Sequence, residues 1–311
     1  MNVQPANVST LTKEITIEIL NAFSLPKGEF WQNTVGSIFG KPARRFSEIF
    51  AKFDQDIAAY GITEAAKRLL PYFVESSRAI GIENVPKEGP LVIASNHPGV
   101  VDGVSIIANL HRKDIKVIVG GMPFLQKLPV ARNFTIHTVK NNDAIRANVV
   151  RSAIRHLKEG GTLLIFPSGQ IDPDPAVLPG AREALENWSK SIAIMLRHVP
   201  ETQFLNAITS GVLHEKFTHT PLTFLKKDGV GKRRIMEMIQ VMRQMVFREK
   251  LGLVPLVTFD RSFTLHDLGI EGRKDAERIW KEIVQRAKIL LDTHVTFLEP
   301  SITLDRTQHA G

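Results

Sequence analysis

Short apolar runs alternate with helical stretches along the middle of this chain, and no other feature constrains its fold as strongly. The runs are bounded by glycine, proline or polar residues, as in strands buried on both faces of a sheet. Buried strands separated by helices predict an α/β fold with a largely parallel central sheet flanked by helices. We expect strands at residues 91–95, 115–119, 135–139, 162–166 and 204–209, and a further strand-like segment at 254–259.

Helical periodicity dominates both ends of the 311-residue sequence. Before residue 80, apolar residues recur at the spacing of one helix face, and further helices are expected at 231–250 and 273–292. A chain of this length exceeds one typical domain. We therefore expect a helical domain at 1–79 and an α/β domain with a helical C-terminal extension at 80–311. The N-terminal apolar face consists of Phe46, Ile49, Phe50, Phe53, Ile57 and Tyr60.

The first candidate functional site lies in residues 96–103, which read Asn-His-Pro-Gly-Val-Val-Asp-Gly. They directly follow the expected strand 91–95, so His97 is predicted on a loop held by rigid structure. Asp102 follows five positions later and can orient an imidazole that acts as a general base. A simpler interpretation stays open, in which Asp102 caps the next helix and His97 is an ordinary turn residue.

The second motif, residues 160–169, reads Gly-Gly-Thr-Leu-Leu-Ile-Phe-Pro-Ser-Gly. It predicts a turn, a buried strand and a second turn at Pro167-Ser168-Gly169. A nucleophilic role for Ser168 is disfavoured, because the glycine two positions upstream that marks the nucleophile elbow of hydrolases is absent. Ser168 is interpreted instead as a turn residue or a substrate contact.

Taken in this order, the two motifs resemble the first and third sequence blocks of the glycerolipid acyltransferases, which transfer acyl groups to glycerol phosphates and lysophospholipids. Residues 82–86 and 178–181 are also similar to that family, and the resemblance extends over residues 80–215. The third block has Ser168 where most members have glutamate. In this respect it is most similar to the soluble plastid-type glycerol-3-phosphate acyltransferases, which also carry a helical N-terminal domain. The family's own sheet is mixed.

The resemblance also implies a substrate site. The plastid-type enzymes carry arginines where Ile171 and Pro173 stand here, so a phosphate contact from those positions is missing. Lys140 falls where the plastid-type second block keeps a basic phosphate contact, which makes it the first candidate for binding an acceptor phosphate. The other candidate substrate-binding residues are Arg132, Arg146 and Arg182, together with Pro167, Ser168 and Gly169 of the third block.

Acyl transfer from a thioester to a hydroxyl requires a base, and His97 oriented by Asp102 can supply one. No covalent acyl-enzyme is needed, and the chain has no cysteine to form one through a thiol. We expect acyl-coenzyme A or acyl carrier protein as co-substrate, with no permanently bound cofactor and no metal ion. The expected acceptor is a glycerol phosphate or lysophospholipid. The alternatives are an unphosphorylated or glycosylated lipid acceptor, and a non-catalytic lipid-binding protein.

The formal net charge of +8 and the pI near 9.7 indicate an anionic partner. Nucleic acid is disfavoured, because the sequence has only 2 Tyr and 3 Trp and no recognised nucleic-acid-binding motif. An anionic membrane surface, or the acidic carrier of an acyl donor, fits better. No apolar run approaches the ~18 residues of a spanning helix, and no signal peptide is recognisable. We therefore expect a cytoplasmic protein that contacts the inner face of a membrane peripherally.

The expected helix at 231–250 combines an apolar face with a basic remainder, which is typical of a helix lying in a membrane interface. The alternative is a helix that packs its apolar face on the core and exposes its basic face to solvent. Both interpretations are compatible if the helix is packed on the core and its basic rim faces lipid. The apolar face contains Ile235, Met238, Ile239, Met242, Met245 and Val246. The basic residues are Lys232, Arg233, Arg234, Arg243, Arg248 and Lys250, with Lys226 and Lys227 upstream.

Overall fold

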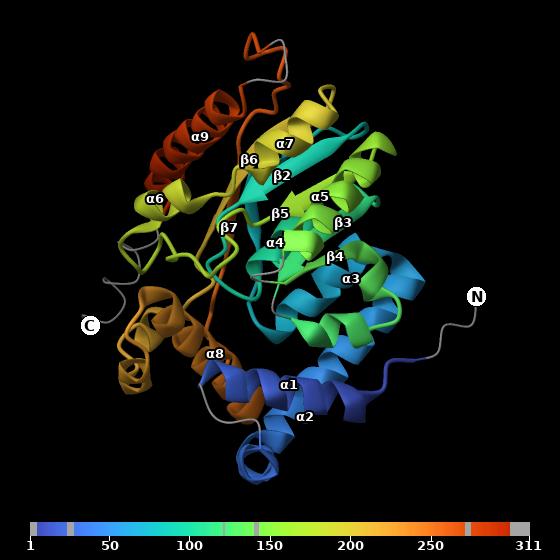
Figure 1. The fold of residues 1–311 in the computed structure, drawn as a ribbon. Helices are drawn as coiled ribbons and strands as arrows, with labels where there is room; N and C mark the ends of the chain where they lie inside the picture. The colour runs from blue at the N-terminus through green and yellow to red at the C-terminus, as the bar shows by residue number, and fades with distance from the viewer. Residues whose placement is uncertain (1–4, 24–27, 121, 140–142, 271–274, 299–311) are drawn as a thin grey trace.

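The computed structural model describes residues 5–23, 28–120, 122–139, 143–270 and 275–298. A seven-stranded sheet at the centre has the strand order β1-β7-β6-β2-β5-β3-β4 (Figure 1). The strands are β1 (Arg78–Ile80), β2 (Leu91–Ser95), β3 (Ile115–Gly120), β4 (Thr135–Thr138), β5 (Thr162–Ile165), β6 (Gln203–Ser210) and β7 (Leu256–Phe259).

Neighbouring strands of this sheet are parallel except for the antiparallel pair β6 and β7. The sheet is therefore mixed and mostly parallel, which confirms the α/β class, and all six predicted strands are present. The prediction that residues 1–79 are entirely helical is wrong at its end, because β1 begins at Arg78 and pairs with β7. A three-residue edge strand is too short to show a periodicity of its own in the sequence.

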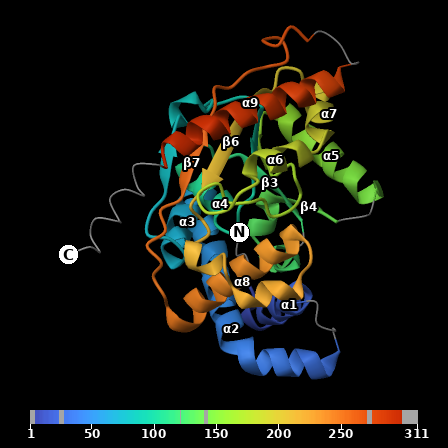
Figure 2. The same cartoon turned by 90° about the vertical axis from the view of Figure 1, so that its left-hand side faces the viewer.

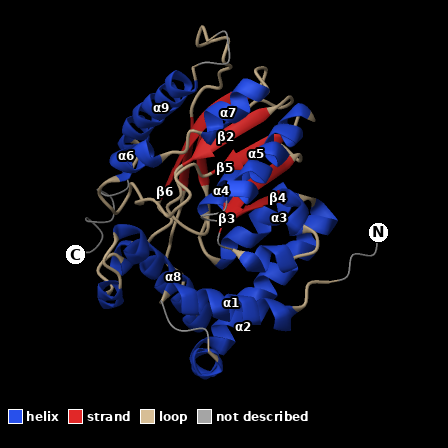
Figure 3. Cartoon of the chain, in the orientation of Figure 1, coloured by secondary structure: helices blue, strands red, loops and turns tan. Residues whose placement is uncertain are grey.

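Helices cover both faces of the sheet (Figure 3). Within the described residues they are α1 (Val8–Ala22), α2 (Glu29–Tyr60), α3 (Ile62–Leu69), α4 (Asp102–Asn109), α5 (Asp143–Lys158), α6 (Ala181–Ala184), α7 (Ser191–His198), α8 (Gly229–Phe247) and α9 (Ala276–Thr296). No helix in this part of the chain is long and apolar enough to cross a membrane.

Alternate residues of the strands face two different hydrophobic cores. Leu91 and Ile93 of β2 belong to a core shared with α1–α4, whereas Val92 and Ala94 belong to a core shared with α5, α7 and α9. All five residues of β2 are buried, which explains why its sequence is an uninterrupted apolar run up to its last residue. Burial on both faces fixes β2 as a rigid support for the loop that follows it.

The N-terminal helices pack on the same core as β2 and α4. Phe46 and Phe50 stack with a ring-centroid distance of 4.5 Å, and both rings contact Phe124 edge-on. Tyr60, predicted on the same apolar face, is instead 55% exposed, with Arg68 lying 3.9 Å over its ring. The division of the chain into two domains at residues 79 and 80 stays a prediction.

Helix α8 lies against α1 and α2 on the side of the molecule away from α9 (Figure 2). Arg45 on α2 donates to the carbonyl of Met245, and Gln244 donates to the carbonyl of Phe73. Ile235 and Met245 are buried as the sequence predicted, but Val246 is 49% exposed. Contacts on both sides therefore fix α8, and they bring its middle to the loop after β2.

Candidate active site

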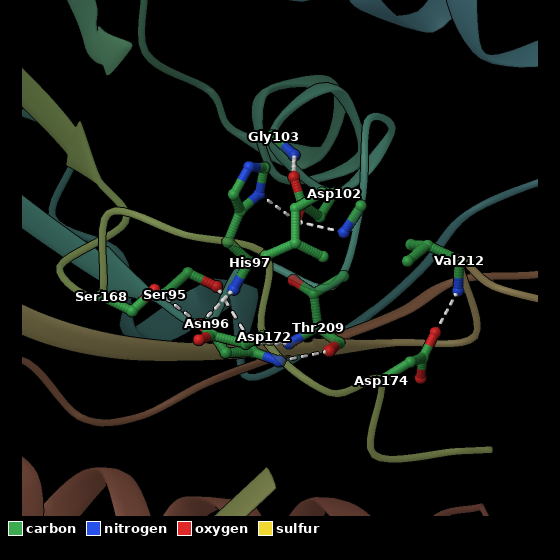
Figure 4. A network of polar contacts seen from close by, with 12 residues as sticks. Ser95, Asn96, His97, Asp102, Gly103, Ser168, Asp172, Asp174, Thr209 and Val212 are labelled. Carbon is green, nitrogen blue, oxygen red and sulfur yellow. Dashed lines mark hydrogen bonds and ion pairs between the residues drawn. The ribbon is translucent and has the colours of Figure 1, made fainter. Parts of the chain in front are cut away.

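The candidate site lies at the carboxyl edge of the three central strands β2, β5 and β6, which are parallel to one another (Figure 4). The loops that leave these strands carry the two sequence motifs. The loop after β2 holds His97, and the turn after β5 holds Ser168. Ligand sites in open α/β sheets form at this edge, because the loops converge there while the strands keep them in register.

His97 and Asp102 form a direct hydrogen bond, with 2.8 Å between Nδ1 and Oδ2. The Asp102 carboxylate is buried and also accepts the backbone N–H groups of Gly99 at 3.1 Å and Gly103 at 2.5 Å. Because a carboxylate can only accept a hydrogen bond, this contact fixes the tautomer in which Nδ1 carries the ring proton. In the described part of the chain Nε2 has no hydrogen-bond partner, and the His97 side chain is 28% exposed.

Asp102 is the first residue of α4, and the N-cap position is taken by Val101, which makes no side-chain capping bond. The interpretation of Asp102 as a simple helix cap therefore does not describe its contacts. Its two oxygens bind the imidazole and the backbone on either side of the turn. This is the geometry that a general base with an orienting carboxylate requires.

Phe166, the last apolar residue before the Pro-Ser-Gly turn, holds the other side of the imidazole. Its ring centroid lies 4.6 Å from that of His97, with the planes inclined at 31°. A Cβ atom added to Gly103 would come within 3.3 Å of the same phenyl ring, so the glycine leaves room for it. The first and third sequence blocks are thus packed directly on one another.

Asp172 locks the two loops together through the main chain. Its Oδ2 accepts the backbone N–H of His97 at 2.9 Å and the hydroxyl of Ser168 at 3.0 Å, and its own N–H donates to the His97 carbonyl at 2.7 Å (Figure 4). The hydroxyl of Ser168 also lies 3.0 Å from the carbonyl of Gln170. Ser168 is therefore a turn residue that supports Asp172.

Two further buried side chains attach these loops to the end of β6. Asn96 pairs with the backbone of Thr209, donating to its carbonyl at 2.9 Å and accepting its N–H at 2.8 Å. Asp174 accepts the N–H groups of Gly211, Val212 and Leu213 at 2.8–2.9 Å. Such satisfied buried networks hold backbone segments in a single arrangement.

The electrostatics of the site are dominated by carboxylates. Burial alone would lower the pKa of His97, but Asp102, Glu237 and Asp172 outweigh it and raise this pKa to about 9. Burial raises the pKa of Asp172 to about 6, against the opposing effects of His97, Ser168 and Arg233. Burial, with Asp102 adding to it, raises the pKa of Glu237 to about 7. Protons in this cluster are therefore shared among coupled groups.

The remaining predicted substrate residues are spread more widely. Pro167, Ser168 and Gly169 form the predicted turn, with the Gly169 N–H bonded to the Phe166 carbonyl at 3.0 Å and Gly169 at φ 62°. Lys140 lies outside the described residues. The three arginines lie on separate elements. Arg132 is exposed and its charge opposes the burial that raises the pKa of Asp54, Arg146 is exposed on α5, and Arg182 is paired with Asp292 of α9 at 2.5 Å.

Sequence reasoning missed four residues of this site: Phe166 and Asp172 contact His97, Glu237 acts on it electrostatically, and Arg233 bonds the Ile171 carbonyl next to Asp172. The first two had a local signal, because both belong to the third block or its Asp-Pro continuation. Arg233 and Glu237 lie on α8, where the sequence marked only a basic amphipathic helix. Nothing in that pattern indicates which turn of the helix meets the loop that carries His97.

Comparisons with known proteins agree with the residues at this site. Residues 76–199 match the family model described as Acyltransferase, and a search of curated proteins found no match. Among solved structures, the 1-acyl-sn-glycerophosphate (LPA) acyltransferase PlsC from Thermotoga maritima is similar, at 15% identity over 92% of each chain with a TM-score of 0.44. The matched segment contains His97, Asp102 and the complete third block. Over residues 76–199 the chain therefore matches the acyltransferase family, and this segment holds both candidate motifs of the site.

Proposed function

We propose that this protein transfers a fatty acyl group from an acyl thioester, either acyl-coenzyme A or acyl carrier protein, to the hydroxyl of a glycerol-phosphate or lysophospholipid-type acceptor. The observation that carries the proposal is the His97–Asp102 pair. A buried carboxylate fixes Nδ1, while Nε2 is left without a partner among the described residues at the open edge of the sheet.

In this mechanism Nε2 of neutral His97 removes the proton from the acceptor hydroxyl as its oxygen attacks the thioester carbonyl. The tetrahedral intermediate then collapses, the carbon–sulfur bond breaks, and the imidazolium returns its proton to the leaving thiolate. Asp102 keeps the proton on Nδ1 and stabilises the imidazolium while it exists. Both products leave neutral at the reacting atoms, and the base is regenerated.

A direct transfer without an acyl-enzyme is supported by the contacts of Ser168. Its hydroxyl lies 3.0 Å from Asp172 Oδ2 and 3.0 Å from the Gln170 carbonyl. Nδ1 of the proposed base His97 is hydrogen-bonded to Asp102 and not to Ser168. A serine nucleophile requires its hydroxyl to be bonded to the base, and here that hydroxyl bonds to the Asp172 side chain instead.

Recognition of an acceptor phosphate is supported by the contacts of Arg233, and by the place of Lys140 in the sequence relative to the plastid-type second block. The Nε of Arg233 donates to the carbonyl of Ile171 at 2.8 Å, its single hydrogen bond within the described residues, which leaves both Nη groups for a ligand. Its charge acts on Asp172, which bonds the His97 backbone. A guanidinium fork suits a phosphate geometrically. Arg233 thus contacts Ile171, and the plastid-type enzymes carry an arginine at the position that Ile171 occupies in this chain.

An unphosphorylated or glycosylated acceptor is the second candidate, and Ile171 itself favours it. This side chain is buried and apolar, and Pro173, two positions further on, is buried as well, so neither side chain offers a contact to a phosphate. If Arg233 serves only to hold the Ile171 backbone, the acceptor needs no phosphate. The two candidates differ in their acceptor and share the same chemistry at His97.

We also propose that the protein, located in the cytoplasm, works on an anionic membrane surface without spanning it. Support comes from a short 3-10 helix, η7 (Pro221–Leu225), immediately before α8. Leu222, Phe224 and Leu225 on this element are 41%, 74% and 46% exposed, and Lys226 and Lys227 follow. Apolar side chains flanked by lysines suit the boundary between lipid headgroups and acyl chains. Each lysine or arginine near such a surface contributes roughly 1 kcal/mol.

The decisive experiment measures acyl transfer by mass spectrometry with acyl-coenzyme A, acyl carrier protein and a panel of acceptors. His97→Ala should lower turnover by about 100-fold or more, the usual range for loss of a general base, with the fold retained by circular dichroism. Asp102→Asn should also be strongly damaging, because the amide disturbs the tautomer. A His97→Ala protein that keeps half of its activity would refute the mechanism. Lipid binding without turnover in the wild type would favour the non-catalytic alternative.

A further inference from the structure

Glu237 on α8 reaches the catalytic loop from a distant part of the chain. The backbone N–H of Val100 acts on its carboxylate and lowers the pKa of that group, against the larger effect of burial, and a Cβ atom added to Gly99 would lie 3.0 Å from its Oε1. Both residues lie between His97 and Asp102 in the sequence. The side chain therefore contacts the turn that sets the distance between the base and its orienting carboxylate.

One carboxylate oxygen of Glu237 has no donor in the described part of the chain. Oε1 is buried and has no hydrogen-bond partner within the described residues. Leaving a buried acceptor unpaired costs about 1–3 kcal/mol, more when it is charged, so a protein rarely keeps one without a reason. A cavity of about 10 Å³ adjoins this side chain, enclosed by α8 and the loop 98–101. By volume it holds at most about one water molecule.

Two neighbouring glutamines on α8 form hydrogen bonds to main-chain groups of other segments. Gln240 accepts the His214 N–H at 2.8 Å and donates to the Val212 carbonyl at 2.7 Å, and Gln244 donates to the Phe73 carbonyl at 2.6 Å. Neutral amides thus perform the structural tasks of this helix face. A glutamine at position 237 could accept the Val100 N–H equally well, so attachment of the loop does not require the charge of Glu237.

The negative charge of Glu237 acts on His97. The ionised groups that act on Glu237 are His97 and Asp102 from the catalytic loop and Arg234 from its own helix. In turn Glu237 acts on His97 together with Asp102 and Asp172. An imidazole becomes positively charged when it takes the acceptor proton. A second negative charge nearby therefore stabilises the imidazolium more than the neutral ring, which is the condition for lowering the barrier.

We propose that Glu237 is a positioning residue of the acyl-transfer reaction, which holds the turn between His97 and Asp102 and adds a negative charge to those of Asp102 and Asp172 near the imidazole. The inference rests on the proposed function, because its effect is exerted through His97 as the base. Glu237 touches neither substrate nor the reacting atoms in this proposal. It acts by fixing the loop and by raising the proton affinity of the ring.

The test compares the pH dependence of kcat/KM for the wild type and Glu237→Gln. Glutamine keeps the shape of the side chain and an acceptor for the Val100 N–H, but it removes the charge. We expect the pH at which activity is half-maximal on the acid side to fall by about one unit, as for loss of a neighbouring charge. The KM for the acceptor should not change. A half-maximal pH equal to that of the wild type would overturn the proposal.

Two further variants separate charge from folding. Glu249→Gln removes the same charge just after α8, where the carboxylate pairs with Lys216 and Arg243 and does not act on His97. It should leave the pH profile unchanged. Glu237→Asp keeps the charge but withdraws it from Val100, so kcat should fall while the pH profile stays close to wild type. This variant decides the matter if Glu237→Gln does not fold, because a wild-type kcat would overturn the positioning role.

Failure of this inference is distinguishable from failure of the proposed function. A wild-type protein without acyl-transfer activity contradicts the function itself. An active wild type whose pH profile is the same as that of Glu237→Gln leaves the function intact and removes Glu237 from it.

Discussion

Asp172 and His97 exchange hydrogen bonds through their main chains and one side chain: the Asp172 N–H donates to the His97 carbonyl at 2.7 Å, and the His97 N–H donates to Asp172 Oδ2 at 2.9 Å. The pair joins the loop after β2 to the segment after β5. It fixes the backbone of the proposed base independently of Asp102, which fixes the ring.

This lock predicts that Asp172→Ala lowers kcat by about 10- to 100-fold, because small displacements of a catalytic group cost up to about 10²-fold. Asp172→Asn is the matched variant. In the wild type Oδ2 carries both side-chain bonds and Oδ1 has no partner in the described residues, so an amide oxygen at the Oδ2 position preserves both bonds. We expect the asparagine variant to be several-fold more active than the alanine variant. Steady-state kinetics and thermal melts of both variants check this, and equal activities would contradict it.

The pKa of His97 predicts an alkaline activity profile. The base is active only when neutral, and the carboxylates around it raise its pKa to about 9. We therefore expect kcat/KM to increase with pH from 7 to about 9 and then to level off. Below that pKa each pH unit changes the neutral fraction about tenfold. A His97→Ala sample at each pH corrects for alkaline hydrolysis of the thioester. A profile already level at pH 7 would show that the cluster does not hold the proton on His97.

Recognition of the acceptor predicts a change in KM. If the acceptor carries a phosphate, Lys140→Ala and Arg233→Gln should each raise the KM for glycerol-3-phosphate or lysophosphatidate with little change in kcat, because uniform binding is lost. Arg182→Gln is the control, since its partner Asp292 lies on α9. An unphosphorylated acylglycerol should be insensitive to all three changes. If neither phosphorylated compound is a substrate of the wild type, the unphosphorylated acceptor becomes the leading candidate.

Membrane association predicts a loss of vesicle binding when η7 is altered. Phe224→Ser removes the most exposed side chain of that element, and the lost burial in lipid should weaken binding by about tenfold or more. Ile289→Ser on α9, whose side chain is 55% exposed, is the matched control and should bind as the wild type does. Co-sedimentation should require anionic vesicles and decrease at high salt. Binding that is indifferent to lipid charge would reject the proposed surface.

The local patterns of the sequence were sufficient for the strands and for the His97–Asp102 pair. Residues 91–95 are buried on both faces of the sheet, so their environment appears directly as an apolar run. His97 and Asp102 lie five positions apart, and the turn between them decides their contact. The edge strand β1 lacked such a signal, because three residues paired with a distant strand carry no periodicity of their own.

Only the tertiary structure decided what surrounds the imidazole. Glu237, whose charge acts on His97, and Arg233, which bonds the Ile171 carbonyl, both come from α8, whose amphipathic pattern indicated a packed face but not the loop that this face meets. The antiparallel pairing of β6 with β7, and the contacts of α8 with α1 and α2, place that helix beside the site. Hydrophobic patterning reflects near neighbours in the sequence, whereas the approach of Glu237 to the His97 loop depends on packing between elements far apart in the chain. The sequence by itself thus determined the contact between His97 and Asp102, and the packing of α8 determined the electrostatic environment of the proposed base.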